Sequence, residues 1–185
     1  NAQFLLDRRI PAGDWNTKTA QKELNEMLKA KYPSADKLVT WVSNYQVFFD
    51  TQKIDSLGLD YAAIKQDAVN LLKKNKMVQY ACDMEKASIE SIPEEIKYRI
   101  INGYNRERSG GVQVILKPAH YSNGMKGTTH GAWNGYDTHI PLVFMGWGIQ
   151  HGASTKPVYM TDIAPTICAL LHIQAPNGCI GEPIF

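Results

Sequence analysis

The sequence is organised around one stretch, KGTTHGAWNGYDTHIPLVF, which runs from Lys126 to Phe144. Three glycines stand four residues apart in it and bracket a histidine, His130, before an apolar run begins. Glycine lets a loop adopt positive φ and lets its backbone approach a ligand closely. The apolar run is typical of a strand that is buried on both faces of a parallel sheet. The stretch therefore predicts a shaped site loop that leads into a buried strand.

Hydrophobic periodicity predicts the elements around this stretch. We expect an irregular lead-in over residues 1–14, and helices after that alternate with strands, which favours an α/β or α+β fold. A compact ββαβαβ set over residues 37–117 is a candidate lobe of its own. The expected elements are a helix from Asn16 or Thr17 to Pro33, a hairpin over residues 38–49, a helix from Asp60 to Lys74, strands over 77–82, 112–116 and 139–145, a helix from Ser91 to Ile101 with a Ser91–Glu94 capping box, and a last helix over 163–171.

The charge and the apolar runs exclude some classes of partner. Twenty basic and eighteen acidic side chains give a net charge of +2, with no block of like charges, so nothing favours nucleic acid or an acidic membrane surface. The longest apolar run, residues 140–149, is much shorter than the roughly 20 residues of a membrane span. The chain begins at Asn1 without a recognisable leader. We therefore expect a soluble protein with a small-molecule partner.

The three cysteines form no metal-binding motif. They are most simply interpreted as buried free thiols, and a Cys168–Cys179 bridge is the alternative in an oxidising compartment.

Two groups of residues are candidates for chemistry. His130, Asp137 and His139 offer a set of two histidines and one carboxylate for a metal ion. The alternative is that Asp137 caps the loop and His139 is a hydrogen-bonded histidine at the start of a strand. The turn over residues 106–111 offers two arginines for a phosphate, although a solvated turn is the simpler interpretation. The sequence contains no nucleophile elbow, P-loop, zincin helix or dinucleotide fingerprint.

Four blocks of sequence carry a family resemblance. They are Gly-Thr-Thr-His-Gly (127–131), Tyr-Asp-Thr-His-Ile-Pro-Leu (136–142), Thr-Asp-Ile-Ala-Pro-Thr (161–166) and Gly-Glu-Pro-Ile (181–184). In this order they resemble the C-terminal part of the alkaline phosphatase superfamily, and most of all bacterial periplasmic phosphate-ester hydrolases of the type I phosphodiesterase and nucleotide pyrophosphatase branch.

The resemblance implies a fold. Residues 1–185 would be one fragment of a larger catalytic domain, the C-terminal part of an α/β/α sandwich. Residues 37–117 would be an inserted, ferredoxin-like α+β lobe, and residues 118–185 would hold the metal-ligand loop, a core strand, the last helix and the tail.

The resemblance also implies a site. His130 matches a ligand of one of two zinc ions, whereas Asp137 and His139 match no ligand and would shape the loop or orient its histidine. The threonine or serine nucleophile and the other zinc ligands have no counterpart in this chain. The family's Asp-His-Gly metal motif would lie just before a segment like Asn1–Gly13.

We therefore expect the C-terminal fragment of a zinc-dependent phosphatase or phosphodiesterase, inactive alone, from a periplasmic or secreted protein that acts on small phosphate esters. Exposed strand edges would favour dimerisation. The alternatives are a non-enzymatic module that binds a ligand or a protein, and an independent mononuclear metal enzyme that uses His130, Asp137 and His139.

Overall fold

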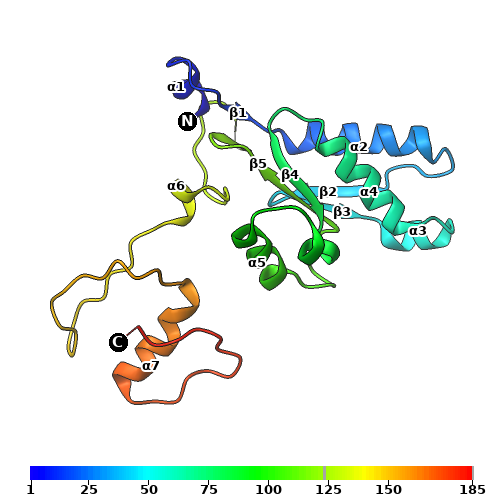
Figure 1. Cartoon of the computed structure of the whole chain (residues 1–185). Coiled ribbons are helices and arrows are strands. Elements are labelled where there is room, and N and C mark those ends of the chain that lie inside the picture. Colours follow the sequence, from blue (N-terminus) through cyan, green and yellow to red (C-terminus); the bar gives the residue numbers. More distant parts are fainter. Residues whose placement is uncertain (123, 185) are drawn as a thin grey trace. The chain divides into compact units, whose positions relative to one another are not determined.

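The computed structural model describes residues 1–122 and 124–184, which divide into two compact units between Ile140 and Pro141. The centre of the first unit is an antiparallel sheet with the strand order β2-β3-β5-β4 (Figure 1). The strands are β2 (Val39–Ser43), β3 (Gln46–Phe49), β4 (Val78–Asp83) and β5 (Val112–Leu116). The mixture of helices with this sheet confirms the predicted α/β class.

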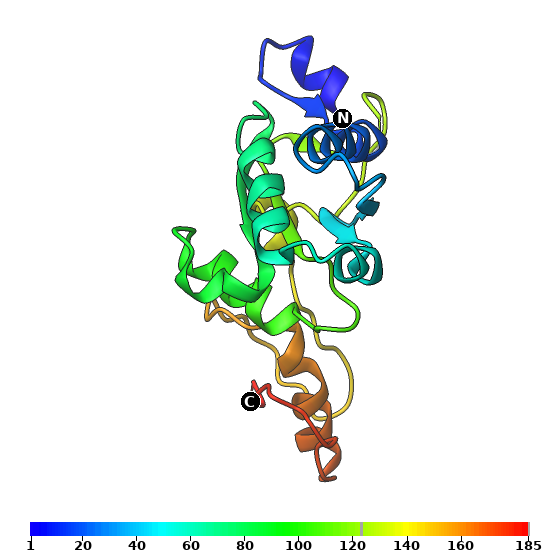
Figure 2. The ribbon, with the colours of Figure 1, turned by 90° about the vertical axis from the view of Figure 1, so that its right-hand side faces the viewer.

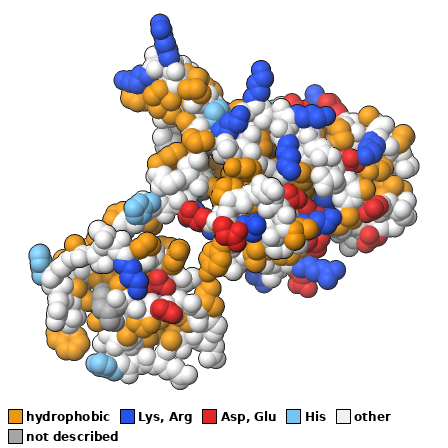
Figure 3. All heavy atoms as spheres, viewed as in Figure 1, with side chains coloured by type: hydrophobic (Ala, Val, Ile, Leu, Met, Phe, Trp, Pro, Cys, Tyr) orange, Lys and Arg blue, Asp and Glu red, His pale blue; other side chains and the backbone are white. Residues whose placement is uncertain are grey.

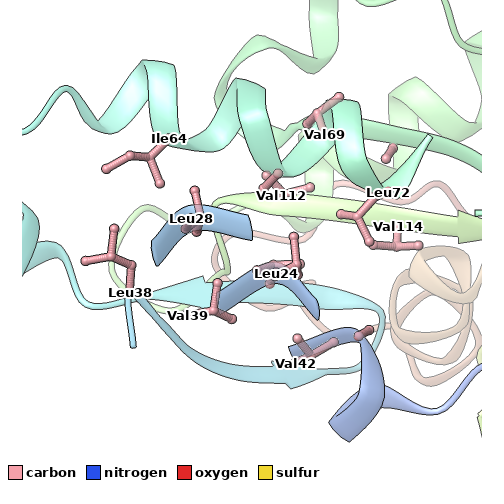
Figure 4. Close-up of a cluster of buried hydrophobic side chains, with 14 of the residues drawn as sticks. Leu24, Leu28, Leu38, Val39, Val42, Ile64, Val69, Leu72, Val112 and Val114 are labelled. Atoms are coloured by element: carbon pink, nitrogen blue, oxygen red, sulfur yellow. The ribbon is translucent and has the colours of Figure 1, made fainter. Parts of the chain in front are cut away.

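Helices cover both faces of this sheet. On one face α2 (Thr17–Lys31) and α4 (Tyr61–Leu72) lie side by side (Figure 1, Figure 2). Their apolar side chains meet those of the strands in the main core, as Figure 4 shows for Leu28, Leu72 and Val114. On the other face, Ile115 packs with η1 (Met84–Ile89) and α5 (Glu94–Gly103) in a second cluster. The alternation of Val114 and Ile115 between the two clusters is the period of two that a strand imposes.

Local signals explain the elements that the sequence predicted correctly. The side chain of Asn16 accepts a hydrogen bond from the Thr19 amide at 2.9 Å and caps α2. The hairpin turns through Asn44 and Tyr45, whose φ angles of 49° and 59° match the right-handed twist of the strands. The predicted helix over residues 60–74 and the predicted strands β4 and β5 are confirmed with small shifts at their ends.

The structure corrects some local predictions. α5 begins after Pro93 without any side-chain cap, so the predicted Ser91–Glu94 capping box is wrong, although the helix is confirmed. The lead-in forms a short helix, α1 (Ala2–Leu6), because the side chain of Asn1 accepts from the Phe4 amide. A short helix, α3 (Thr51–Ser56), which Asp50 caps, was not predicted from the sequence.

The predicted strand over residues 139–145 does not form. After the single-turn helix α6 (Gly135–Thr138), this segment belongs to no strand, and Val143 and Met145 are 80% and 95% exposed. A strand needs a neighbouring strand for its backbone groups, and no described strand forms a β-ladder with this segment. The apolar pattern is present, but the sheet that it predicts is not.

The lobe has the arrangement of a ferredoxin-like fold, with four antiparallel strands and two helices on one face of the sheet. Its chain, however, enters this arrangement at a different strand. Helix α2 precedes residue 37, yet Leu24 and Leu28 belong to the main core of this lobe. A short parallel pair, β1 (Gly13–Asp14) and β6 (His120–Tyr121), lies beside it. That residues 37–117 are an insertion in a larger domain stays a prediction.

The second unit consists of an extended segment, η2 (Met160–Asp162), the predicted helix α7 (Ile163–Leu171) and the tail. Asp162 holds the tail, because its carboxylate accepts from the Tyr159 amide at 2.8 Å and from the Glu182 amide at 3.1 Å. A Cβ on Gly181 would clash with the carbonyl oxygen of Thr161, so only glycine allows this close approach.

Candidate functional site

The glycine loop, residues 126–139, begins against the N-terminal segment. The Tyr121 hydroxyl accepts from the Ala2 amide at 2.6 Å and donates to the Gly127 carbonyl at 2.7 Å. The Gln3 amide donates to the Met125 carbonyl at 2.9 Å. One tyrosine thus joins the first residues of the chain to the start of the loop.

Tyr45, in the β2–β3 turn, supports the middle of the loop. Its hydroxyl accepts from the Ser122 amide at 3.2 Å, and its ring stacks on Trp15 with 6.2 Å between centroids. The ring lies 3.8 Å from the place where a Cβ on Gly131 would be, and Gly131 has a φ of +94°. Burial raises the pKa of the Tyr45 hydroxyl, which therefore stays neutral at physiological pH. The expected positive φ is thus found in the loop at Gly131.

The end of the loop is held by α6. The Asp137 carboxylate accepts from the Ala132 amide at 2.6 Å, and this bond closes the turn that follows His130. The Tyr136 hydroxyl accepts from the Ala119 amide at 2.9 Å. Trp133 packs against the second apolar cluster of the lobe. Asp137 therefore shapes the loop directly, and the two aromatic residues serve packing and hydrogen bonding here.

His130 itself is exposed, and its ring makes no hydrogen bond within the described residues. His139 is also exposed and ends α6. Nowhere in residues 1–122 and 124–184 do three histidine, cysteine, aspartate or glutamate side chains come together as a metal site. Since a protein zinc site uses three or four protein ligands, the imidazole of His130 alone does not fit such an ion. The structure does not assemble His130, Asp137 and His139 into one metal set.

The remaining sequence candidates have structural explanations. The turn that carries Arg106 and Arg108 is exposed and is closed by hydrogen bonds between Asn105 and Ser109. Cys82, Cys168 and Cys179 are free thiols, and burial raises the pKa of Cys82 to about 12. Among the described helices, none is both long and apolar enough to cross a membrane.

A buried ion cluster in the lobe was not predicted from the sequence. The ammonium group of Lys65, on α4, lies 2.9 Å from an Asp83 carboxylate oxygen and also contacts Glu85. The side chains of Lys65 and Asp83 are only 3% and 5% exposed. The partners lie far from Lys65 along the chain, so the only signal in the sequence was a lysine on the apolar face of a helix.

The ammonium group of Lys65 pairs with both carboxylates of the cluster. Burial alone would lower the pKa of Lys65, but its hydrogen bonds to Glu85 and Asp83 outweigh burial and raise that pKa. The bond to Lys65 in turn lowers the pKa of Glu85. Tyr104 donates a hydrogen bond to Glu85 at 3.1 Å. Burial raises the pKa of Tyr61, whose ring lies beneath the ammonium group, to about 12. The charges are therefore fixed at neutral pH, as expected of a structural cluster.

Comparisons with known proteins connect the glycine loop to an enzyme family. No protein-family profile matches the chain. Over the whole chain, a protein of Myroides odoratus named as a calcium-transporting ATPase is 45% identical. The alkaline phosphatase PafA of Elizabethkingia meningoseptica is 44% identical over 98% of the chain, and the alkaline phosphatase PhoV of Synechococcus elongatus is 50% identical over 77%. The crystal structure of PafA superposes on the whole chain with a TM-score of 0.93. The chain belongs to the alkaline phosphatase superfamily.

Within the alkaline phosphatase superfamily, the chain corresponds to the C-terminal portion of its relatives. It spans 34%, 33% and 26% of the three relatives' own lengths, in the order given, and 35% of the PafA chain in the crystal structure. The family resemblance of the four sequence blocks is thereby confirmed. The narrower assignment to the phosphodiesterase branch stays a prediction, as does the role of His130.

Proposed function

We propose that this chain forms part of a zinc-dependent phosphoric ester hydrolase, supplies His130 as one ligand of a two-zinc centre, and is inactive alone. Similarity to the alkaline phosphatases PafA and PhoV carries the proposal, since it extends through the Thr-His-Gly loop. Its substrates would be small phosphate monoesters or diesters, with no nucleic acid or membrane partner.

The geometry of the loop supports a ligand role for His130. The residues on either side of it are fixed by Tyr121, Tyr45 and Asp137, while the imidazole itself points to no partner among the described residues. The backbone next to this ring is held in place, and the ring nitrogens make no hydrogen bond within the described residues. Such a ring can bind a metal ion together with ligands from another part of a protein. A zinc ion bound there would act as a Lewis acid on a phosphoryl oxygen.

We expect the isolated chain to be inactive because it supplies too few ligands for a zinc ion. One imidazole cannot replace the three protein ligands of a catalytic zinc. Phosphoryl transfer also needs a nucleophile in line with the leaving group, and the threonine or serine nucleophile that the family resemblance implies has no counterpart in this sequence. A periplasmic or secreted location is proposed with the function, by analogy with the family.

A chimera tests the proposal. This chain would replace the matching third of PafA, and hydrolysis of p-nitrophenyl phosphate and bis(p-nitrophenyl) phosphate would be measured together with bound zinc. We expect His130→Ala to lower activity by roughly 100-fold or more and to remove zinc, because even residues that merely orient a metal ligand are worth about 10–100-fold. His151→Ala, at another exposed histidine, is the matched control and should change neither. Full activity and full zinc content in His130→Ala would overturn the proposal.

Asp137→Ala in the same chimera separates loop shaping from direct ligation. If Asp137 only closes the turn through the Ala132 amide, the variant keeps both zinc ions but binds one of them more weakly. If Asp137 were itself a ligand, as in a mononuclear site with His130 and His139, the ion would be lost outright.

A further inference from the structure

The indole nitrogen of Trp15 is buried without a hydrogen-bond partner among the residues that the structure describes. The whole residue is only 1% exposed. An indole N–H group is a donor only, and a buried one normally finds an acceptor. This donor is therefore available to an acceptor that the described chain does not supply.

The position of this indole is fixed by its surroundings. The backbone amide of Trp15 donates to the Tyr121 carbonyl at 2.9 Å, and the indole stacks on the Tyr45 ring with 6.2 Å between the centroids. A donor that is held in place before binding loses little conformational freedom when an acceptor arrives. The N–H group of Trp15 is therefore pre-organised for a ligand.

Trp15 also lines a hollow of about 200 Å³ that is shared by α2 and α4. The apolar wall of this hollow consists of Ala20 and Leu24 of α2 and of Leu71 and Leu72 of α4. Figure 4 shows Leu24 and Leu72 in the same buried cluster. Because an apolar cavity of about 150 Å³ accommodates benzene, the hollow has room for a molecule of about six to eight non-hydrogen atoms.

The charges around the hollow favour an uncharged ligand. Glu23 and Lys74 are the exposed residues of its lining, and their charges are opposite. On the face drawn in Figure 3, basic and acidic side chains are interspersed over the lobe, so no field of one sign steers an ion towards the hollow. Burial of an unpaired charge against leucine side chains is also costly. The lining therefore fits a hydrocarbon body better than an ion.

We propose that this hollow binds a small uncharged organic molecule with a hydrocarbon body and one acceptor oxygen. The oxygen accepts a hydrogen bond from Trp15 Nε1, and the hydrocarbon body packs against the leucines of α2 and α4. Cyclohexanone has this chemistry and this size. A water molecule alone is the competing occupant. The site shares no residue with the glycine loop, so the proposal does not depend on the proposed function.

The test is a titration of the 185-residue chain with cyclohexanone, followed in proton–nitrogen NMR spectra of the tryptophan indoles. The signal of Trp15 is identified by its absence in Trp15→Phe. We expect this signal to move downfield and to saturate with a dissociation constant of roughly 1 mM, because a hydrogen bond to the ketone deshields the indole proton. Trp41 and Trp147, which are 64% and 86% exposed, are internal controls and should show no saturable shift.

Ala20→Leu places the ligand in the hollow. Ala20 is 6% exposed and lines the hollow, so the larger side chain should fill it and weaken binding roughly 10-fold or more. Ala30→Leu, the same substitution at an exposed position of the same helix, is the matched control and should leave binding unchanged. Circular dichroism checks that each variant is folded. If Ala20→Leu does not fold, Leu71→Phe, at a half-buried position of the same wall, replaces it.

A Trp15 signal that stays in place, or that moves without saturation together with the other indole signals, would overturn the proposal. Saturable binding that is unchanged in the folded wall variant would place the ligand elsewhere and would also overturn it. An indole proton of Trp15 that exchanges magnetisation with water and does not respond to cyclohexanone would show that water is the sole occupant.

Discussion

Leu28 in the lobe and Val143 after the glycine loop are both large apolar residues, yet Leu28 is 1% exposed and Val143 is 80% exposed. Leu28 lies on a helix whose opposite face is polar, and its neighbours come from elements within the same unit. Val143 lies in a run without a polar face, and no strand among the described residues forms a β-ladder with it. The contrast shows that the first unit contains its own apolar core, whereas the second unit leaves several of its large apolar side chains exposed.

The largest expected loss of stability follows from removing the buried ammonium group of Lys65 in the lobe. Lys65→Met leaves Asp83 buried without a counter-charge, which typically costs about 3–5 kcal/mol of the free energy of unfolding. Lys31→Met, which breaks an exposed pair with Asp67, is the control and should cost far less. Both are measured by urea unfolding followed by circular dichroism. Equal losses would mean that the cluster is not a structural element of the lobe.

Shortening one large apolar side chain to alanine in each unit compares the packing of the two units directly. Leu28→Ala should cost roughly 2–5 kcal/mol, because it leaves a cavity in the main core. Val143→Ala in the isolated chain should stay within about 0.5 kcal/mol, as expected of a surface residue. Thermal and urea unfolding measure both changes. A comparable cost at Val143 would show that its unit already has a packed core.

A substitution in the glycine loop should cost an intermediate amount of stability. Gly131→Ala puts a Cβ on a residue with a φ of +94°, and such strain costs roughly 1–3 kcal/mol. Gly135→Ala is the control, since that position has ordinary φ and open space around it. Limited proteolysis between Lys126 and His139 reports the change. Equal cleavage of the two variants would argue against a preformed loop.

The smallest expected effect is the change in the stability of the lobe with pH. The hydrogen bond from Lys65 lowers the pKa of Glu85 in the folded state, so the ionised carboxylate stabilises the lobe at pH above its unfolded value of about 4.5. That contribution is lost as the pH falls through the lowered folded value. Lys65 has the opposite sign, because its raised pKa stabilises the fold below 10.5 and this contribution is lost as pH rises through the folded value.

Unfolding measured from pH 7 to 3 tests the acid side. Glu85→Gln should be less stable than the unchanged chain at neutral pH and should lose less stability on acidification. A parallel decline in both proteins would show that Glu85 does not contribute.

The sequence predicted those parts of the fold that depend on local signals. Asn16 and Asp60 cap their helices, and Asn44 favours the left-handed turn of the hairpin, so these elements were recognisable from neighbouring residues alone. The strand at Val143 was not formed, since strand formation depends on partners that a pattern cannot supply.

The site was predictable in part. The Thr-His-Gly block singled out His130, and Asp137 was expected to be a loop-shaping residue if not a ligand. The support from Tyr45 and Tyr121 was not predicted, because both contacts join residues brought together by the fold rather than by sequence spacing. The same is true of Lys65 and Asp83.

The most direct test of the central claim is a joint measurement on the isolated 185-residue chain: zinc bound per molecule by equilibrium dialysis, and hydrolysis of p-nitrophenyl phosphate in the same samples. We expect no tight stoichiometric zinc and no hydrolysis above the buffer rate, because His130 stands alone among the described residues. One tightly bound zinc per chain together with turnover of the ester would contradict the account.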